Sequence, residues 1–419
     1  MKTITLLTSG TRGDVIPYLA LGKGLQDAGY TVRIAAPIGF ANLIHEHKIT
    51  FSPFEGNPSD LLIEQGNLTP LTLGKNFIHS IQTTKQFLAQ ARPLYQKMLQ
   101  TASEACKGSD ILIHGLPTLW GAHIAEGLKI PAVRALLQPL APTNEFASAL
   151  LPFRFSIKGI NWFSHFIVTQ IIYLSWRSEI NHVRQNLFRL GSAPLLDPSL
   201  QPASKQPFTL NAFSEQIVPR PKDWNEKQII TGYWHVQTQE WTAKKELLQF
   251  VNSSKNLIAI GFGSPNTKDI SQTINILDKA LNQTNSQAVL TIPSKWHNLI
   301  KSKNIFPIEY VPHEWLYKHA KVAIHHGGAG TTAASFQVGI PTITLPLAID
   351  QFFWGERVYK IGVGPKAIPQ RKLTAKKLAH AIQITLSEKT MKARAKNISE
   401  RLSQENGIQV AVSQIRKII

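Results

Sequence analysis

The feature that most constrains the fold is a regular alternation between short β-branched apolar runs and segments with helical spacing of apolar residues. Residues 2–8 are a β-branched apolar run, residues 15–29 place Leu21 and Leu25 one turn apart, and residues 30–37 are a second apolar run. This order is that of a βαβ unit, the repeating element of a parallel sheet. The same pattern predicts further strands at 110–117, 130–139, 256–264, 287–293, 308–312, 322–328 and 341–347.

The alternation is interrupted once, by a Pro-rich stretch at 192–236, and then resumes without a detectable sequence repeat. A chain of 419 residues is too long for one ordinary core. We therefore predict an α/β protein with two doubly wound Rossmann-like domains facing across a cleft, where ligands bind at the carboxyl ends of the strands. The predicted parts are an N-terminal domain (1–215), a linker region (216–240), a C-terminal domain (241–400) and a last helix (401–419) that packs back on the N-terminal domain.

Composition excludes several classes of protein. The single cysteine, Cys106, excludes an internal disulfide and a zinc or iron–sulfur site built from cysteines. The formal net charge is +19, but no zinc-finger, homeodomain or RNA-recognition signature accompanies it, so no nucleic-acid partner is expected. Attraction to an anionic membrane surface would explain the charge. Ordinary solvated helix faces explain it more simply.

The most apolar segment is INWFSHFIVTQIIYLSW, residues 160–176. A spanning helix needs about 20 consecutive apolar residues, and Ser, His, Thr and Gln interrupt this one. We predict a buried helix here; the alternative is a helix that lines an apolar pocket or lies on a membrane surface. The first residues, MKTITLLTSGTRGD, predict a buried strand rather than a signal peptide. We therefore expect a cytoplasmic protein, with at most a peripheral contact with a membrane.

A turn almost without side chains lies in the segment AIHHGGAGTTAASFQVG, residues 323–339. Its small residues, 327–330, fall between a predicted strand end and a predicted helix start. Backbone N–H groups and the positive end of the helix dipole attract an anion there, and glycines let a phosphate approach closely. A tight packing turn is the structural alternative. No Lys follows the glycines, so the segment is not a P-loop.

Several segments of this chain resemble the inverting, nucleotide-sugar-dependent glycosyltransferases with two Rossmann-like domains, the GT-B type. HHGGAGTTAASFQVGIPTITLPLAIDQFFWGERVYKIGVGP is similar to their donor-binding signature, and TSGTRGDVIPYLALGKGLQDAGYTVRIAAP is similar to their N-terminal strand, loop and helix. VPRPKDW, GFGS, YVPHEWL and KLTAKKLAHAI follow in the order of that family. The resemblance spans essentially the whole chain and is greatest to the sterol 3-β-glucosyltransferase and bacterial antibiotic glycosyltransferase branches.

The resemblance implies a role for each residue of the donor site. His326, Gly328, Gly330 and Thr331 would contact the donor diphosphate, with Ser264 of GFGS as a further neighbour. His325, by contrast, is expected to be structural.

The Asp350–Gln351 pair would hydrogen-bond sugar hydroxyls, because together a carboxylate and an amide offer acceptors and donors. Asp350 could also be a helix N-cap. Val311 and His313 of YVPHEWL would meet the nucleobase, and Tyr310 stands where many relatives stack a tryptophan on the base.

Asp14 is similar to the catalytic carboxylate that the family proposes, where other branches use a nearby histidine. Transfer of glucose to an alcohol needs a base that removes the hydroxyl proton. An apolar acceptor would raise the pKa of Asp14 and the helix N-terminus would lower it, and the sequence does not decide between them. The structural alternative is that Asp14 only caps its helix and pairs with Arg12.

The resemblance implies an inverting, metal-independent hexosyltransferase that moves glucose from UDP-glucose to the hydroxyl of a lipophilic acceptor such as a sterol. No metal site and no cofactor besides the nucleotide sugar are implied, and the chain has no Asp-x-Asp triplet. The aromatic and aliphatic segment 144–190 favours an apolar alcohol, unless those residues are mostly core. The alternatives are a polyketide, macrolide or glycopeptide glycosyltransferase that uses another UDP- or dTDP-sugar, a nucleotide-sugar epimerase, and an inactive peripheral membrane protein with this fold.

Overall fold

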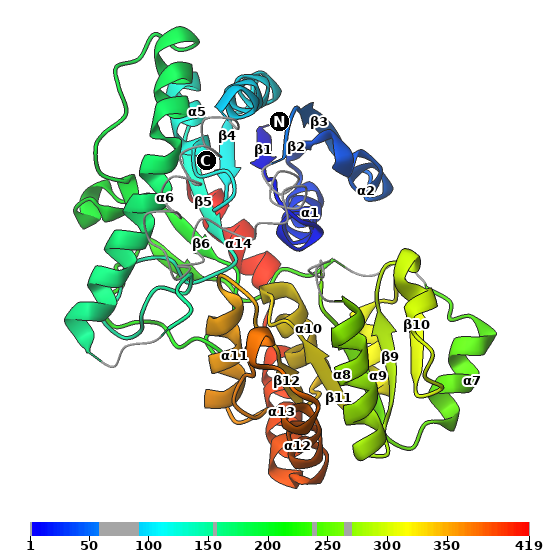
Figure 1. Ribbon diagram of the computed structural model, residues 1–419. Coiled ribbons are helices and arrows are strands. Elements are labelled where there is room, and N and C mark those ends of the chain that lie inside the picture. The colour runs from blue at the N-terminus through cyan, green and yellow to red at the C-terminus, as the bar shows by residue number, and fades with distance from the viewer. Residues whose placement is uncertain (1, 58–91, 154–156, 237–240, 264–269, 419) are drawn as a thin grey trace.

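The computed structural model describes residues 2–57, 92–153, 157–236, 241–263 and 270–418. Two parallel sheets, each in a lobe of its own, organise the chain (Figure 1). The N-terminal sheet has seven strands in the order β3-β2-β1-β4-β5-β6-β7, and the C-terminal sheet has five in the order β10-β9-β8-β11-β12. Every strand pair in both sheets is parallel. The predicted α/β class with two doubly wound domains is confirmed.

The N-terminal lobe contains the first seven strands, and residues 92–105 are helical there as well. Its strands are β1 (Thr3–Leu7), β2 (Thr31–Pro37), β3 (Thr50–Phe54), β4 (Ile111–His114), β5 (Ala132–Leu136), β6 (Thr209–Asn211) and β7 (Gln228–Ile230). Its helices are α1 (Arg12–Asp27), α2 (Ala41–Glu46), α5 (Gly121–Leu128) and α6 (Lys158–Asn186), with 3-10 turns at Ile38–Phe40, Pro198–Leu200 and Ala203–Lys205.

The C-terminal lobe repeats this layout on a smaller scale. Its strands are β8 (Leu257–Gly261), β9 (Gln287–Thr291), β10 (Ile305–Ile308), β11 (Val322–His325) and β12 (Thr342–Thr344). Its helices are α7 (Lys245–Ser253), α8 (Ile270–Gln283), α9 (His313–His319), α10 (Ala329–Val338), α11 (Gln351–Lys360), α12 (Ala375–Ser387), α13 (Lys389–Leu402) and α14 (Gly407–Arg416), with 3-10 turns at Ser294–Leu299 and Gln370–Lys372.

Both faces of each sheet are buried, which explains why the strands are continuous apolar runs rather than alternating ones. On β1, Leu6 packs with α1 and α14 on one face, whereas Leu7 packs with α5 and α6 on the other. On β8, Ile258 faces α8 and α12, and Ala259 faces α7 and α9. Strand alternation therefore places neighbouring residues in separate cores.

One apolar cluster joins the two lobes. It combines Phe213 and Trp224 of the N-terminal lobe with Phe353 and Trp354 of α11, and the rings of Phe213 and Trp354 lie 6.4 Å apart. The backbone is tied across the same boundary, because Arg357 Nε donates to the carbonyl of Ile217 at 2.7 Å. This cluster fixes α11 against the N-terminal sheet.

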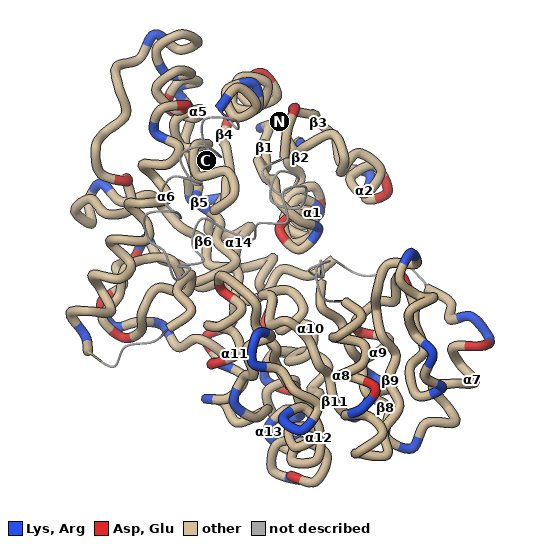
Figure 2. The backbone as a smooth tube through the Cα atoms, in the orientation of Figure 1, with Lys and Arg blue, Asp and Glu red and all other residues tan. Residues whose placement is uncertain are grey.

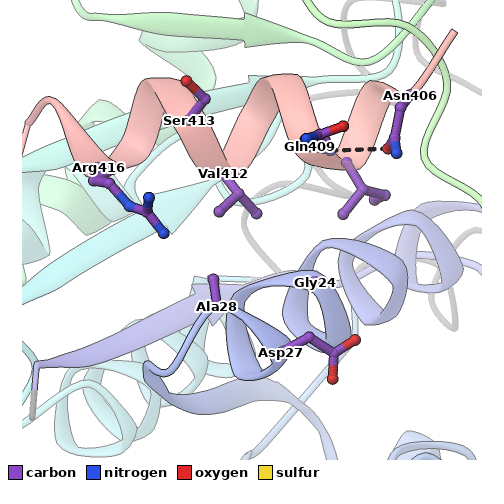
Figure 3. Close-up of a pocket in the computed structure, with 9 residues that line it drawn as sticks. Gly24, Asp27, Ala28, Asn406, Gln409, Val412, Ser413 and Arg416 are labelled. Carbon is purple, nitrogen blue, oxygen red and sulfur yellow. Dashed lines mark hydrogen bonds between the residues drawn. The ribbon is translucent and has the colours of Figure 1, made fainter.

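The last helix, α14, leaves the C-terminal lobe and packs on α1. A Cβ at Gly24 would lie 2.1 Å from Cγ2 of Ile408, so only glycine allows this approach. Figure 3 shows the shallow hollow that remains between the two helices, with Val412 pointing toward Ala28. The hollow lies at the C-terminal half of α1, roughly 15–20 Å along the helix from Asp14 at 1.5 Å per residue. It is therefore separate from the predicted site.

Three expectations differ from the structure. The strand predicted at 308–312 is instead β10, Ile305–Ile308, because the extended pairing with β9 ends at Ile308. Strand β7 lies inside the region predicted as a linker, so the N-terminal sheet extends further than the predicted boundary. The segment 160–176 is helical but not a buried helix, since Phe163 remains 56% exposed and Ile171 52% exposed.

Basic side chains are spread over both lobes and are dense on α12 and α13 (Figure 2). None of the described helices, α6 included, combines the length and hydropathy that crossing a membrane would require.

Candidate functional site

The loop after β1 presents Asp14 at the carboxyl end of the N-terminal sheet. Gly10 has a φ of +106°, and a Cβ at this position would lie 2.6 Å from Oδ2 of Asp14. Glycine is therefore required both for the turn and for the approach of the carboxylate. Asn57 holds the turn from the other side, because its amide accepts from Gly10 N and donates to Gly10 O, each at 3.0 Å.

Asp14 caps its helix and still keeps one oxygen available. Its Oδ2 accepts from the backbone N–H and the hydroxyl of Thr11, both at 2.8 Å, in a capping box. No described residue donates to Oδ1. Burial raises the pKa of Asp14, and the Thr11 hydrogen bonds oppose that effect only in part. Within the described residues Arg12 makes no ion pair with Asp14, so this part of the structural alternative is wrong.

In the C-terminal lobe, the turn between β11 and α10 is fixed by His325 and Gly327. His325 is fully buried at the end of β11, and its Nδ1 accepts from the Gly327 N–H at 3.0 Å. Gly327 has a φ of +88°, and a Cβ here would lie 2.8 Å from the carbonyl oxygen of Gln351. The turn thus packs directly against the start of α11, and His325 is a structural residue of that turn.

The ring of His326 lies between two glycines. A Cβ at Gly263 would be 2.9 Å from its Cε1, and a Cβ at Gly328 would be 2.5 Å from its Nε2. Burial lowers the pKa of His326 to about 4, with the nearby His313 adding to the effect and a backbone contact at Gly261 opposing it. The imidazole is therefore neutral at pH 7. Its Nδ1 is buried without a described hydrogen-bond partner.

The first turn of α10 offers backbone donors beside His326. Gly328 is the N-cap, and the N–H groups of Ala329, Gly330 and Thr331 have no acceptor among the described residues. Open space lies beside Gly330, where an added Cβ would meet nothing within 4 Å. Three unpaired donors at the positive end of a helix, with room in front of them, suit a phosphate group.

Asp350 and Gln351 begin α11 close to that turn. Asp350 occupies the N-cap position, but its side chain does not cap the helix; instead Oδ2 accepts from Trp354 Nε1 at 3.0 Å. The Oε1 of Gln351 accepts from the N–H groups of Leu347 and Ala348, at 2.8 and 3.2 Å. The Nε2 of Gln351 has no acceptor among the described residues and remains free to donate.

The residue before Asp350 is strained. Ile349 has a φ of +55° and a side chain that is 40% exposed. A β-branched residue in this conformation is an outlier and costs on the order of 1–2 kcal/mol. The hydrogen bonds from the N–H groups of Leu347 and Ala348 to Gln351 Oε1 hold the strained turn that precedes Asp350.

The two lobes meet at the carboxylates. Burial raises the pKa of Asp350 to about 6, hydrogen bonds from Trp354 and Gln138 oppose this, and the negative charge of Asp14 adds to it. Residues 336 positions apart in the sequence therefore lie within electrostatic range, one on each lobe. A ring contact between Phe146 and Phe353, 5.5 Å between centroids, borders the same region.

The predicted nucleobase residues lie at the start of α9. The side chain of Val311 is buried in an apolar cluster, but no described residue bonds to its backbone N–H or C=O. His313 is exposed, and its ring lies 5.4 Å from Tyr317. Tyr310 is 56% exposed. Ser264 lies outside the described residues.

Gln138 is near enough to Asp350 to affect the pKa of that carboxyl, although it is not among the predicted site residues. Gln138 lies at the carboxyl end of the strand predicted at 130–139. Ligands bind at the carboxyl ends of parallel strands, so the sequence position of Gln138 could have indicated that it lies near the site. Among the described residues, no group of three or more His, Cys, Asp or Glu side chains is arranged to hold a metal ion.

Comparisons with known proteins match segments of both lobes. Residues 4–146 match the family described as glycosyltransferase family 28 N-terminal domain, and residues 275–415 match the erythromycin biosynthesis protein CIII-like C-terminal domain. Each lobe is therefore similar to a domain of known glycosyltransferases. The candidate residue Asp14 falls in the first match, and His326 and Asp350 fall in the second.

Among curated relatives, this chain is 33% identical to a sterol 3-beta-glucosyltransferase of Debaryomyces hansenii, over 98% of this chain and 26% of that protein. It is 32% identical to the one of Saccharomyces cerevisiae (strain YJM789), over 98% of this chain and 34% of that protein. The chain thus spans about a quarter to a third of the length of these relatives.

Solved structures show the same fold. The glycosyltransferase of kitacinnamycin gives a TM-score of 0.70 at 16% identity, covering 100% of this chain and 99% of that one. Glycosyltransferase VinC, solved in complex with DTDP, gives 0.68 at 18% identity and covers 99% of both chains.

Proposed function

We propose that the protein transfers a hexose, glucose from UDP-glucose, to the hydroxyl of a lipophilic alcohol such as a sterol, with inversion at the anomeric carbon. One observation carries the proposal: a carboxylate of one lobe, Asp14, lies within electrostatic range of a carboxylate of the other, Asp350, to which we assign the roles of base and of sugar ligand. The names of the curated relatives support the sterol acceptor.

Asp14 is the proposed base. Its free Oδ1 takes the proton of the acceptor hydroxyl while the hydroxyl oxygen forms the new bond to the anomeric carbon. A pKa raised by burial suits this role, because a carboxylate is a stronger base when its pKa is closer to the working pH. Thr11 holds the carboxylate through Oδ2 and leaves the second oxygen for the acceptor.

The leaving group departs toward α10. As the bond between the anomeric carbon and the phosphate oxygen breaks, its electron pair stays on the diphosphate. The unpaired N–H groups of Gly330 and Thr331, together with a ring N–H of neutral His326, stabilise that charge. Gly328 allows close approach, and Ser264 is proposed as a further phosphate neighbour. An inverting displacement of this kind passes through an oxocarbenium-like transition state.

The rest of the donor is placed by two further pairs. Asp350 accepts from sugar hydroxyls, and the free Nε2 of Gln351 donates to one. The backbone of Val311 bonds the edge of the base and His313 flanks it. This set would bind an ordinary hexose better than a deoxysugar, because a deoxysugar lacks hydroxyls that the pair can reach.

The acceptor enters from the N-terminal lobe, whose segment 144–190 is rich in aromatic and aliphatic side chains. We propose a cytoplasmic protein that associates peripherally with an anionic membrane, where lipophilic alcohols are concentrated and where a net charge of +19 favours binding.

A natural-product glycosyltransferase that uses another UDP- or dTDP-sugar is the second candidate. It is favoured by the full-length structural likeness to VinC, which was solved with DTDP. An epimerase is less well supported, because it would need no acceptor and no apolar segment to bind one.

Incubation with a panel of labelled nucleotide sugars and a sterol, read by mass spectrometry, tests the proposal. Release of UDP that depends on the alcohol, with a hexosylated sterol as product, is the expected result. Turnover of dTDP-sugars alone would support the second candidate, and conversion of the sugar nucleotide without any alcohol would indicate an epimerase.

A further inference from the structure

Helix α6 exposes its apolar side and buries its polar side along its first half. Asn161, Ser164 and His165 are buried, at 3%, 7% and 0% exposure. Phe163 and Ile167, on the opposite side, are 56% and 39% exposed. A surface helix of a protein surrounded by water has the reverse arrangement.

The buried polar side is built into the N-terminal lobe by hydrogen bonds to residues 140–148. Asn161 Nδ2 donates to the carbonyl of Asn144 at 3.1 Å, and the Ser148 N–H donates to Ser164 Oγ at 2.9 Å. The two ring nitrogens of His165 lie 3.3 and 3.0 Å from the carbonyls of Leu140 and Phe146. These bonds fix the rotation of α6, so the apolar side cannot turn inward.

The exposed side forms one continuous stripe. Its members lie three or four positions apart, the spacing of a single helix face, and they run for about 21 Å along α6 at 1.5 Å per residue. They are Ile160, Phe163, Ile167, Ile171 and Leu174. Next to the stripe, the ring of Phe166 stacks with those of Trp162 and Phe163, at 5.8 and 6.2 Å.

This stripe is not ordinary scatter of apolar residues. Ten of the 17 large hydrophobic side chains that are exposed in the described part of the chain fall within residues 153–196, about a tenth of the sequence. A contiguous apolar patch of this kind marks a place where another apolar surface is met. Figure 1 shows α6 at the left-hand side of the N-terminal lobe, away from α2.

The charges around the stripe indicate which kind of apolar surface it contacts. Residues 146–196 contain five Lys or Arg, of which Arg184 is buried and paired with Glu126, and a single acidic residue, Glu179. Glu179 is 2% exposed and lies 3.4 Å from Arg92, so it shows no negative charge to the surroundings. Lys158 and Arg177, both on α6, stand near the two ends of the stripe, and the Arg177 guanidinium also donates to the carbonyls of Ala193 and Pro194. An apolar helix face flanked by cations complements an anionic lipid surface.

We propose that the outer face of α6 docks on an anionic phospholipid bilayer, with the helix lying in the plane of the headgroups. The stripe enters the interface, and Lys158 and Arg177 meet lipid phosphates.

The docking face is continuous with the site. The segment 140–148 that holds the inner side of α6 follows Gln138, whose side chain helps to lower the pKa of Asp350, and includes Phe146, which contacts Phe353. On this point the inference rests on the proposed function: an acceptor dissolved in the bilayer would reach the carboxylates from beside α6 without crossing water.

Sedimentation of the full chain with vesicles tests the docking, without donor or acceptor present. We expect binding to phosphatidylcholine vesicles that contain phosphatidylglycerol, and weaker binding without the anionic lipid or at high salt. The triple variant Phe163→Ser, Ile167→Ser, Ile171→Ser should lower the partition coefficient at least about tenfold, because each side chain withdraws substantial apolar area from water. The matched control replaces three exposed apolar residues that lie in the other lobe or on α14. In this control, Leu248→Ser, Leu299→Ser and Val410→Ser together should change the partition coefficient less than about twofold.

A second readout does not depend on the folding of the triple variant. Trp162 is 41% exposed on α6, so brominated lipids should quench part of the wild-type tryptophan fluorescence, and Trp162→Phe should lose that quenching. Equal binding by the triple variant and the wild type, or no binding to either vesicle, would refute the proposal. So would a wild-type dimer that the triple variant abolishes, because a second copy would then cover the stripe. Asp14→Asn should bind vesicles normally, so failure of docking and failure of transfer are distinguishable.

Discussion

Replacing Asp350 with Asn should stabilise the folded protein while it weakens the binding of the donor sugar. The pKa of this carboxyl is raised from 3.8 to about 6, chiefly by burial. The folded state therefore binds the proton more tightly than the unfolded state, and stability falls as the pH rises from about 4 to about 6. At 1.36 kcal/mol per pKa unit, ionised Asp350 costs the fold about 3 kcal/mol at pH 8.

The substitution removes this cost without removing the partner of Trp354, because the amide oxygen of Asn can still accept from the indole N–H. The unfolding free energy should rise by about 3 kcal/mol at pH 8 and by only about 1 kcal/mol at pH 4.5, where half or more of the effect has been lost to protonation. Urea unfolding at the two pH values measures both numbers. Asp27→Asn, which breaks only an exposed pair with Lys23, is the control and should change stability by less than about 1 kcal/mol.

An Asn variant that is no more stable than the wild type at pH 8, or whose gain is the same at both pH values, would refute the reasoning. It would mean that Asp350 is better solvated, or better paired, than its burial indicates. A gain in stability with intact donor binding would agree with the raised pKa of Asp350 but would contradict its role in binding the sugar.

Other perturbations test the neighbouring groups. Asp14→Asn should abolish transfer and leave the Kd for the donor, measured by calorimetry, almost unchanged; equal loss of both would count against a catalytic base. The same change removes a negative charge near Asp350 and should lower the pKa of that carboxyl in the folded state, seen as a smaller stability decline that ends at lower pH. His326→Ala should reduce kcat/KM for the donor about 100-fold, as for other donors to a developing anion, and unchanged kinetics would exclude it from the diphosphate site. Gly10→Ala should impair transfer and stability together, because its Cβ would meet Asp14 at 2.6 Å in a conformation that favours glycine.

Local pattern determined a large part of the fold. Strands β1, β2, β8 and β11 lie where apolar runs predict them, because burial on both faces leaves a signal that is readable within each strand. The strand at 308–312 was displaced, since which residues of 305–312 extend depends on the partner, β9. The last two strands of the N-terminal sheet, β6 and the edge strand β7, are only three residues each, too short for any period to show.

The candidate site also has features that the sequence predicts and features that depend on tertiary packing. The glycine turn and the position of Asp14 before a helix could be predicted, because both are properties of a few consecutive residues. The contact of Gly327 with Gln351, and the effect of Gln138 on the pKa of Asp350, could not be predicted, because each joins segments that meet only when strands and lobes pack. The roles of these residues in catalysis and donor binding stay predictions.

For this protein, the sequence by itself determined the two rounds of alternating strands and helices and the chemical types available at their ends. Only the tertiary structure decided that the charge of Asp14 acts on Asp350 and that α6 turns its polar side inward. The reason is physical: periodicity shows that a helix has two faces, but the hydrogen bonds from residues 140–148 choose which face is buried. Likewise, a carboxylate acquires a raised pKa only from the surfaces that surround it after the chain has folded.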